Sequence, residues 1–503
     1  MLWLYDNVAV LTVALATSLV AWLFGGTRGD LLAQVAPWLF VITMEVLLFF
    51  PQRHRGESSM EARVRVWAAL KHDRLVWISG GFLVLLAIPF VNYGLCPHCD
   101  AEMIAAGFDP KPPIPIVPFC VNRVQHLNVV YWFMLALSTA VLVRHGLVRR
   151  GKRMALEFIV WNGMALAILG FVQEVMGAPG PFWDTDNGTF YGNTIDFFSS
   201  FGYSNMAGSY FTTLFGIAVA LWRDHYERFR EETKTHDISK SAPPVPRTFW
   251  KKHYFLIPAG VFLFAAMNTF SRAAIFMVST LAVICFVHTL VSFVSRMHRV
   301  RRVKVVTWSA LIFSLVVYFA VVAAPSSVKK EMDRTGTIEV LDRVTGKMRS
   351  VRAAVDIWKD NRLFGCGGWG YRHFLLTKLS QKEIDMQLHV VGGINVHNDH
   401  LQFMLEHGLV GFGLLVAIVV LLVRPIAVDW RELVRGLRFK SGADLPPRPV
   451  AIFALPAPVL FILLTVFFTV IHACGDCPMR SSAVLVLFFV SLAAMPGFMP
   501  RKG

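Results

Sequence analysis

Charged residues are scarce in this sequence. Asp, Glu, Lys and Arg make up 16% of its 503 residues, whereas a soluble domain carries about a quarter. The apolar fraction is 55%, and the mean hydropathy is +0.53. This balance excludes an ordinary soluble globular protein and predicts a chain that lies mostly within a bilayer.

The sequence also lacks the short alternating segments of a transmembrane β-barrel, and it has no convincing internal repeat. No cleavable signal peptide stands out, since the first apolar run has neither basic residues before it nor a clean small-residue cleavage site. Backbone groups in lipid must be hydrogen-bonded internally. The recurring apolar runs of roughly 18 to 22 residues therefore predict membrane-spanning helices.

We predict an all-α polytopic membrane protein with about twelve spans, organised as a single transmembrane domain over residues 1–503. The predicted spans cover residues 6–24, 31–50, 75–93, 127–145, 156–176, 204–222, 254–271, 273–294, 305–324, 401–423, 452–471 and 482–498. Residues 325–400, between the ninth and tenth spans, form the longest connection on their side. We expect this loop to fold as a helical cap against the membrane face.

The basic residues orient the predicted bundle. One set of connections holds 32 of the 49 Lys and Arg residues. The other set holds 17, of which twelve lie in the long 325–400 loop, and long loops say little about orientation. The positive-inside rule then places both termini in the cytoplasm and the 325–400 loop outside. It also accounts for the net charge of +16 without a nucleic-acid partner; the expected surroundings are membrane lipids.

Six of the seven cysteines fall on the predicted outer side. Only Cys285 lies within a span. An even set in an oxidising compartment predicts disulfides, although the sequence leaves fifteen pairings open. The outer cysteines are Cys96, Cys99, Cys120, Cys366, Cys474 and Cys477.

The 325–400 loop is rich in basic residues, which runs against the topological trend. An anionic ligand at the outer surface is one explanation, and a solvated or headgroup-facing surface is the other. The loop ends at His397, just where the chain re-enters the membrane. Asn398 or Asp399 would suit the N-cap of the following helix, whereas His397 precedes that helix and can accept a proton from a hydroxyl near neutral pH.

Four motifs in this order resemble the O-antigen ligase and polymerase superfamily, over roughly residues 190–425. They are Tyr203-Ser204-Asn205-Met206-Ala207-Gly208, Thr269-Phe270-Ser271-Arg272-Ala273-Ala274, the run 353–367 that ends in Leu-Phe-Gly-Cys-Gly, and His-Asn-Asp-His-Leu-Gln-Phe-Met-Leu-Glu-His-Gly-Leu-Val-Gly from residue 397. Two departures stand out. Arg362 replaces the family's usual Pro, and the family's Arg at the start of the loop helix falls near Lys347, with Arg349 and Arg352 the nearest arginines.

The resemblance implies a GT-C-type glycosyltransferase of the bacterial inner membrane, with its active site facing the periplasm. The implied donor is an undecaprenyl-diphosphate-linked glycan. His397 would take the proton of the acceptor hydroxyl, and one-step attack would invert the anomeric carbon. Arg272, with Arg349 or Arg352, would hold the lipid diphosphate, since a guanidinium stays charged beside lipid and grips phosphate oxygens in pairs. The arginines make a metal unnecessary, so we expect no cofactor.

The resemblance also implies substrate contacts from Asn205, Asn398, His400 and Gln402.

The identity of the acceptor stays open. The acceptor is lipid A–core sugar in an O-antigen ligase, another lipid-linked repeat unit in a polymerase, or a protein hydroxyl.

Asp184 and Asp186 have the spacing of a metal-binding pair, although turn residues are the preferred interpretation of this loop pair. Two readings come from other classes: a lipid-linked glycan transporter, and a membrane thiol oxidoreductase that uses Cys96 and Cys99 with a quinone. For the latter cysteines, structural disulfides are the preferred interpretation.

Overall fold

The computed structural model describes residues 2–93, 114, 117–184, 197–236, 253–295, 338–378, 395–441 and 455–500, together with residues 303, 306, 307 and 311. Within these ranges the chain is helical, and its β-structure is limited to two isolated bridges. The all-α prediction is therefore confirmed.

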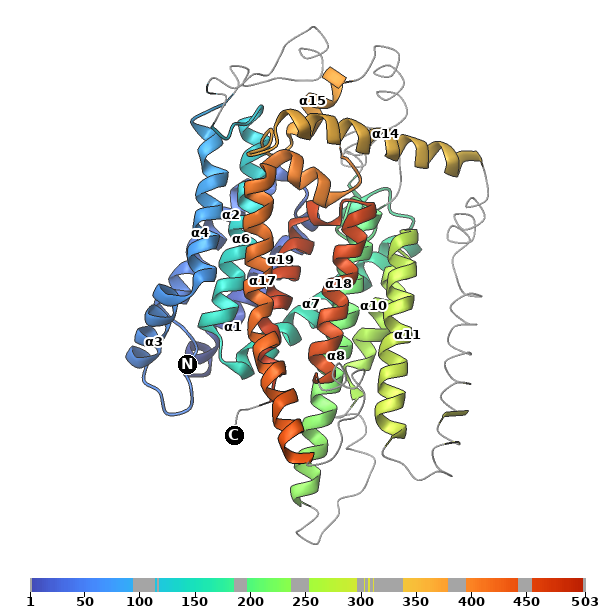
Figure 1. The fold of residues 1–503 in the computed structure, drawn as a ribbon. Coiled ribbons are helices and arrows are strands. Elements are labelled where there is room, and N and C mark those ends of the chain that lie inside the picture. The colour runs from blue at the N-terminus through green and yellow to red at the C-terminus, as the bar shows by residue number, and fades with distance from the viewer. Residues whose placement is uncertain are drawn as a thin grey trace.

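Long helices run side by side in one bundle, and two helices lie across one of its ends (Figure 1). The bundle helices are α1 (Leu2–Trp22), α2 (Gly29–Phe49), α4 (Arg74–Ala87), α6 (Arg123–Val141), α7 (Arg149–Val175), α8 (Ser204–His236), α10 (Leu256–Met267), α11 (Arg272–Val294), α17 (Asp399–Ser441), α18 (Ala457–Gly475) and α19 (Ser482–Ala494). The crossing helices are α14 (Ile338–Asp360) and α15 (Gly370–Lys378). Both chain termini lie at the opposite end (Figure 1).

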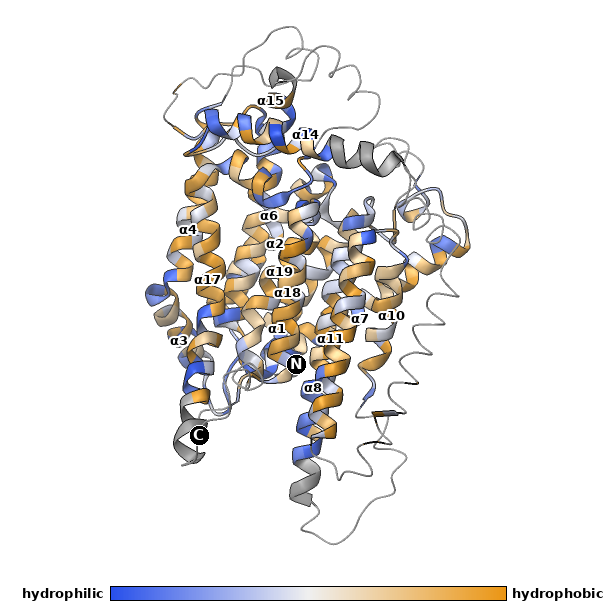
Figure 2. Cartoon of the chain, turned by 45° about the vertical axis from the view of Figure 1, so that its right-hand side comes forward, coloured by the Kyte–Doolittle hydropathy of each residue, from blue (hydrophilic) through white to orange (hydrophobic). Residues whose placement is uncertain are grey.

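The hydropathy pattern agrees with a membrane protein. Apolar residues cover the middle of the bundle and polar residues gather toward its ends (Figure 2). Large apolar side chains such as Trp38 and Phe276 are exposed on the outside, at 71% and 69%, where lipid would cover them. The interior is built around α19, every residue of which is buried.

Six of the described helices are long and apolar enough to cross a membrane. A seventh span is formed if the pair α3 (Ser59–His72) and α4, bent by 65°, counts as one. Eleven of the twelve predicted segments coincide with described helices, several of them short or partly polar. The ninth, 305–324, lies outside the described residues except for isolated positions, so the total of twelve stays a prediction.

Helix α17 is interrupted at Gly408, where the backbone has φ 66° and ψ −175°. The turn segment 362–367 lies against this break. The amides of Leu409 and Val410 donate to the carbonyls of Arg362 and Leu363, at 2.9 and 3.1 Å. The amide of Gly367 donates to the Glu406 carbonyl at 2.8 Å. The break therefore separates residues 399–407 from the rest of α17. The backbone groups on both sides of it that lose helical partners pair with segment 362–367 instead.

The disulfide prediction is wrong for the four outer cysteines that the structure describes. Cys120, Cys366, Cys474 and Cys477 are free thiols. A shared compartment does not bring two Cα atoms to the roughly 5.5 Å that a disulfide needs, and burial raises the pKa of the Cys366 thiol. Cys96 and Cys99 lie outside the described residues, as does Asp186.

We expect Gly408→Ala to destabilise the fold. A Cβ at this position would meet the Leu363 carbonyl oxygen at 2.1 Å, and its backbone conformation is one that only glycine adopts readily. Thermal unfolding in detergent should show a loss of about 2 kcal/mol or more. Gly413→Ala is the matched control on the same helix, since its Cβ meets nothing within 4 Å. A Gly408→Ala protein as stable as this control would contradict the assigned geometry.

Candidate active site

One buried carboxylate gathers side chains from three distant parts of the chain. Asp476 follows the last residue of α18, at the end of the bundle that α14 and α15 cross. Its oxygens accept hydrogen bonds from the Tyr203 hydroxyl at 2.9 Å and the Asn205 amide at 2.7 Å. Lys347 Nζ and His397 Nδ1 each lie 3.4 Å from it. Residues that belong to separate sequence motifs therefore meet at a residue outside all of them.

Asp476 is ionised at neutral pH. Burial alone would raise the pKa of its carboxyl. The hydrogen bond from His397, the charge of Lys347 and the backbone amide of Cys477 more than offset burial and hold the pKa of Asp476 well below its ordinary value. The site therefore keeps a fixed negative charge under α14.

His397 is oriented by this carboxylate. Its Nδ1 faces Asp476, so Nδ1 carries the proton and the Nε2 lone pair is left available. The side chain keeps 23% of its surface exposed, so a substrate can reach it. The backbone of His397 has a positive φ of 55°. Phe270, which precedes Ser271, and Trp369, which stacks on Arg480, also have positive φ. Such strained residues concentrate at functional sites.

The site extends to the start of α11. The Ser271 hydroxyl donates to Asn205 Oδ1 and accepts from the amide of Ala274 at 3.1 Å, which caps the helix. Arg272, the next residue, is half-buried in the first turn. The sequence motifs at 203–208 and 269–274 are thus joined by a direct hydrogen bond.

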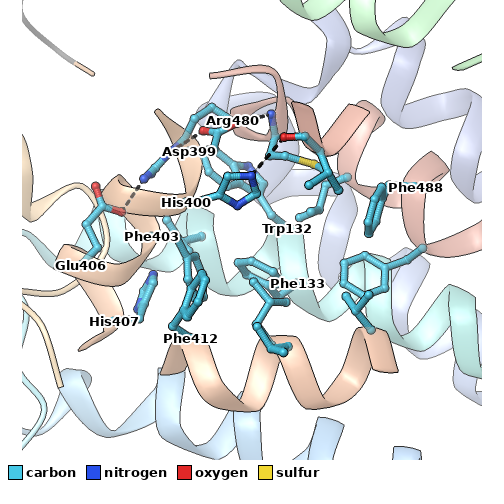
Figure 3. Close-up of a pocket in the computed structure, with 18 of the residues that line it drawn as sticks. Trp132, Phe133, Asp399, His400, Phe403, Glu406, His407, Phe412, Arg480 and Phe488 are labelled. Carbon is cyan, nitrogen blue, oxygen red and sulfur yellow. Dashed lines mark hydrogen bonds and ion pairs between the residues drawn. The ribbon is translucent and has the colours of Figure 1, made fainter. Parts of the chain in front are cut away.

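A second charged cluster lies beside the first and is fully buried. Arg480 donates to Glu406 Oε2 at 2.8 Å and has its Nε 3.8 Å from Asp399 (Figure 3). Its guanidinium also stacks over the Trp369 ring, 4.9 Å from the centroid. Asp399 accepts from the amide of Met479 at 2.7 Å. These contacts fix the short connection between α18 and α19 against the first turns of α17.

Three of the predicted substrate-binding residues make contacts within the chain. Asn398 Oδ1 accepts from the amide of Leu401 at 3.0 Å, which confirms its capping role for α17. Gln402 is buried and accepts from the amide of Val396 at 3.0 Å, thereby holding the segment that leads into His397. His400 Nε2 lies 3.1 Å from the Val470 carbonyl. A substrate role for these residues stays a prediction.

The two candidate arginines of α14 are exposed, and within the described residues neither contacts the Asp476 cluster. Lys347 instead reaches the cluster, and its Nζ also donates to the Gly475 carbonyl at 3.2 Å. Phosphate binding by Arg349 or Arg352 stays a prediction, as does the role of Arg272. The position of the family's Arg at the start of the loop helix falls near Lys347, so the sequence already pointed to a basic residue at this place.

An apolar cavity of about 350 Å³ opens beside the first turns of α17. Its walls are mainly aromatic and aliphatic side chains of α6, α17 and α19, among them Trp132, Phe133 and Phe488 (Figure 3). Its polar residues are Asp399, His400, Glu406, His407 and Arg480. The cavity thus combines a long apolar lining with a few charged groups at one end.

Three potential metal ligands lie at the same place. One ligand atom each from His397, Asp476 and Cys477 lie within 4.8 Å of one another, and such a nitrogen, oxygen and sulfur set suits zinc. Burial raises the pKa of the Cys477 thiol, whereas a metal requires the thiolate. Lys347 also shares the carboxylate. The residues therefore fit a metal poorly while Lys347 stays in place.

Comparison with known families supports the motif analysis. The profile of the family described as O-antigen ligase matches residues 257–416. That stretch contains Arg272, Lys347 and His397 but ends before Asp476 and Arg480. A comparison with curated proteins gives no match. The matched stretch contains three of the four motifs and confirms the family resemblance that they indicate; the motif at 203–208 lies outside it.

We expect Glu406→Ala to destabilise the fold strongly. It leaves the buried Arg480 with only the longer contact to Asp399, and removing one partner of a buried ion pair costs about 3 to 5 kcal/mol. Asp356→Ala is the control, since its ion pair with Lys359 is exposed at both ends and should matter by less than about 1 kcal/mol. Equal unfolding temperatures for the two variants would refute the buried pair.

Proposed function

We propose, on the premise that residues 257–416 belong to the O-antigen ligase family, that this protein transfers a glycan from undecaprenyl diphosphate to an acceptor hydroxyl. The family places the chain among ligases and polymerases of lipid-linked glycans. The observation that carries the proposal is His397, held by the ionised Asp476 and still reachable from outside. We place the reaction at the periplasmic face of the bacterial inner membrane, with both termini in the cytoplasm.

The His397–Asp476 pair suits a general base. Because Asp476 faces Nδ1, Nε2 is free to take the proton of the acceptor hydroxyl. The acceptor oxygen then attacks the anomeric carbon as the bond from that carbon to the diphosphate oxygen breaks. The carboxylate stabilises the imidazolium that forms, as in other acid–histidine pairs. A single displacement of this kind inverts the anomeric configuration.

The leaving diphosphate needs cations. Negative charge grows on its bridging oxygen in the transition state, and preorganised positive groups stabilise that charge. Arg272 lies next to Ser271, which is hydrogen-bonded to Asn205 of the Asp476 cluster. Lys347 approaches the cluster from α14, and the exposed Arg349 and Arg352 follow on the same helix. We assign the phosphate contacts to Arg272 and to one of the α14 arginines.

The apolar cavity supports a lipid-linked donor. Its lining of aromatic and aliphatic side chains suits part of a polyprenyl chain, which has no hydrogen-bonding groups to satisfy. His400 belongs both to the cavity and to the motif that begins with His397. The donor would therefore enter laterally from the lipid, and the acceptor would arrive by a second route at the outer surface.

We propose lipid A–core sugar as the acceptor, in keeping with the name of the matched family. The test is a purified assay with a defined undecaprenyl-diphosphate glycan, offered lipid A–core, a second lipid-linked unit or a peptide, with products identified by mass. Transfer to lipid A–core supports the ligase. Elongation of the lipid-linked unit alone would replace the ligase with a polymerase, and no transfer to any acceptor would refute the enzyme.

We expect His397→Ala to lower turnover by about a hundredfold to ten-thousandfold, the usual contribution of general acid–base catalysis. Donor binding and unfolding temperature should stay near those of the wild type. His54→Ala, which removes an exposed histidine from the connection between α2 and α3, should have no effect on turnover. If His397→Ala retained turnover similar to His54→Ala, another group would have to be the base.

We expect transfer to persist after treatment with EDTA, because positive side chains can neutralise the leaving diphosphate without a metal. Turnover measured before and after chelation tests this. If chelation abolished activity and zinc restored it in the wild type but not in Cys477→Ser, the metal would instead be assigned to His397, Asp476 and Cys477. Restoration by magnesium or manganese would point to Asp184 and Asp186.

A further inference from the structure

A second cavity lies at the other end of the bundle from the candidate active site. It has a volume of about 450 Å³ and is lined by residues of α3, α4 and α17, together with Arg144 from the turn Leu142–Gly146. We call it the arginine groove. Its lining residues are His72, Asp73, Arg74, Arg144, Leu421, Arg424, Pro425, Val428 and Asp429.

The wall of this groove is held in place by Arg144. Pro425 lies inside α17 and has no N–H, so the carbonyl of Leu421 loses its helical donor. Arg144 Nη1 supplies a replacement at 3.0 Å. The same guanidinium contacts Asp73, with its Nε 2.6 Å from Oδ2, and Asp73 caps α4 by accepting from the Leu75 amide. One arginine thus joins the start of α4 to the proline turn of α17.

The remaining charge of the groove is available for a ligand. Arg74 and Arg424 are exposed, and no described carboxylate forms an ion pair with either. Asp73 is already shared by Arg144 and His145. With three arginines against two carboxylates, the groove keeps a positive excess, and an anion would meet two guanidinium groups from different helices.

The surroundings of the groove mark the edge of a membrane. Helix α3 bends by 65° from α4 and exposes an apolar stripe of Met60, Val64 and Trp67 at helical spacing. Trp77 is 68% exposed, one turn into α4 from Arg74. Tryptophan is enriched where the bilayer meets water. The groove therefore lies at the level of lipid headgroups, on the side of the two termini (Figure 1).

We propose that the arginine groove binds the headgroup phosphate of an anionic phospholipid in the leaflet on that side. Basic pockets between membrane helices recognise such headgroups. Arg74 and Arg424 contact the phosphate, Arg144 keeps the two helices at the required spacing, and Val428 contacts the start of the acyl chains. The site is independent of glycan transfer and lies at the other end of the bundle.

The test uses the purified full chain in detergent, titrated with phosphatidylglycerol or with phosphatidylcholine of the same acyl chains. Bound lipid is measured by native mass spectrometry and by the shift in unfolding temperature. Phosphatidylglycerol should be retained and should stabilise the protein more than phosphatidylcholine. Equal retention of the two lipids would overturn the proposal, and so would equal stabilisation by inorganic phosphate alone, which would assign the groove to a soluble anion.

Replacing both groove arginines tests the assignment. Arg74→Ala with Arg424→Ala should weaken phosphatidylglycerol binding by roughly tenfold or more, since each basic residue near a headgroup contributes substantially. The control removes two exposed arginines that do not line the groove, one between α2 and α3 and one in the first turn of α7, as Arg55→Ala with Arg150→Ala. Arg74→Lys with Arg424→Lys keeps the charge and should retain most of the binding.

Equal losses in the alanine pair and the control would mean that net charge acts and that no groove site exists. Unchanged binding in the alanine pair would also refute the site. Because both readouts are independent of catalysis, they stand apart from any failure of the proposed glycan transfer.

Discussion

The buried carboxylate of Asp476 is the interaction on which the candidate site depends. A charge taken out of water is costly unless hydrogen bonds and opposite charges replace its hydration. Here the compensation comes from Tyr203, Asn205, Lys347 and His397. These donors lie at the start of α8, on α14 and before α17, so satisfying one carboxylate requires that all three elements dock in one arrangement. Positioning of the proposed base is then a consequence of folding.

A backbone constraint completes that arrangement. The break at Gly408 lets the amides of Leu409 and Val410 pair with segment 362–367, so the loop after α14 is fixed to α17 by its main chain. Glycine is needed because a Cβ at residue 408 would collide with the Leu363 carbonyl. The family's two glycine-rich motifs therefore describe the two sides of one contact. The contribution of these glycines to the site is indirect, because the contact that they allow brings α14, with Lys347, over the residues that precede α17.

The sequence predicted the helices better than it predicted individual contacts. Long apolar runs are the clearest signal in the sequence, and eleven of the twelve predicted segments coincide with described helices. Asp476 and Arg480 were missed because the ten-residue connection between the two predicted spans 452–471 and 482–498 carries no periodicity. The disulfide prediction failed for the four outer cysteines that the structure describes, because compartment and parity say nothing of distance. Exposure of Arg349 and Arg352 likewise depends on how α14 rotates, which sequence spacing leaves open.

The balance of charge explains why exposed cations are useful in such a site. Arg480 is neutralised by Glu406 and Asp399, and Asp476 by Lys347 and its hydrogen bonds, so the buried part is close to neutral before substrate arrives. A diphosphate brings negative charge, and Arg480 and Lys347 could bind it only by giving up a carboxylate partner that they already have. The cations that meet it must come from groups still in contact with solvent, where an unpaired arginine costs little. We therefore expect the donor diphosphate to be bound at the exposed face of α14.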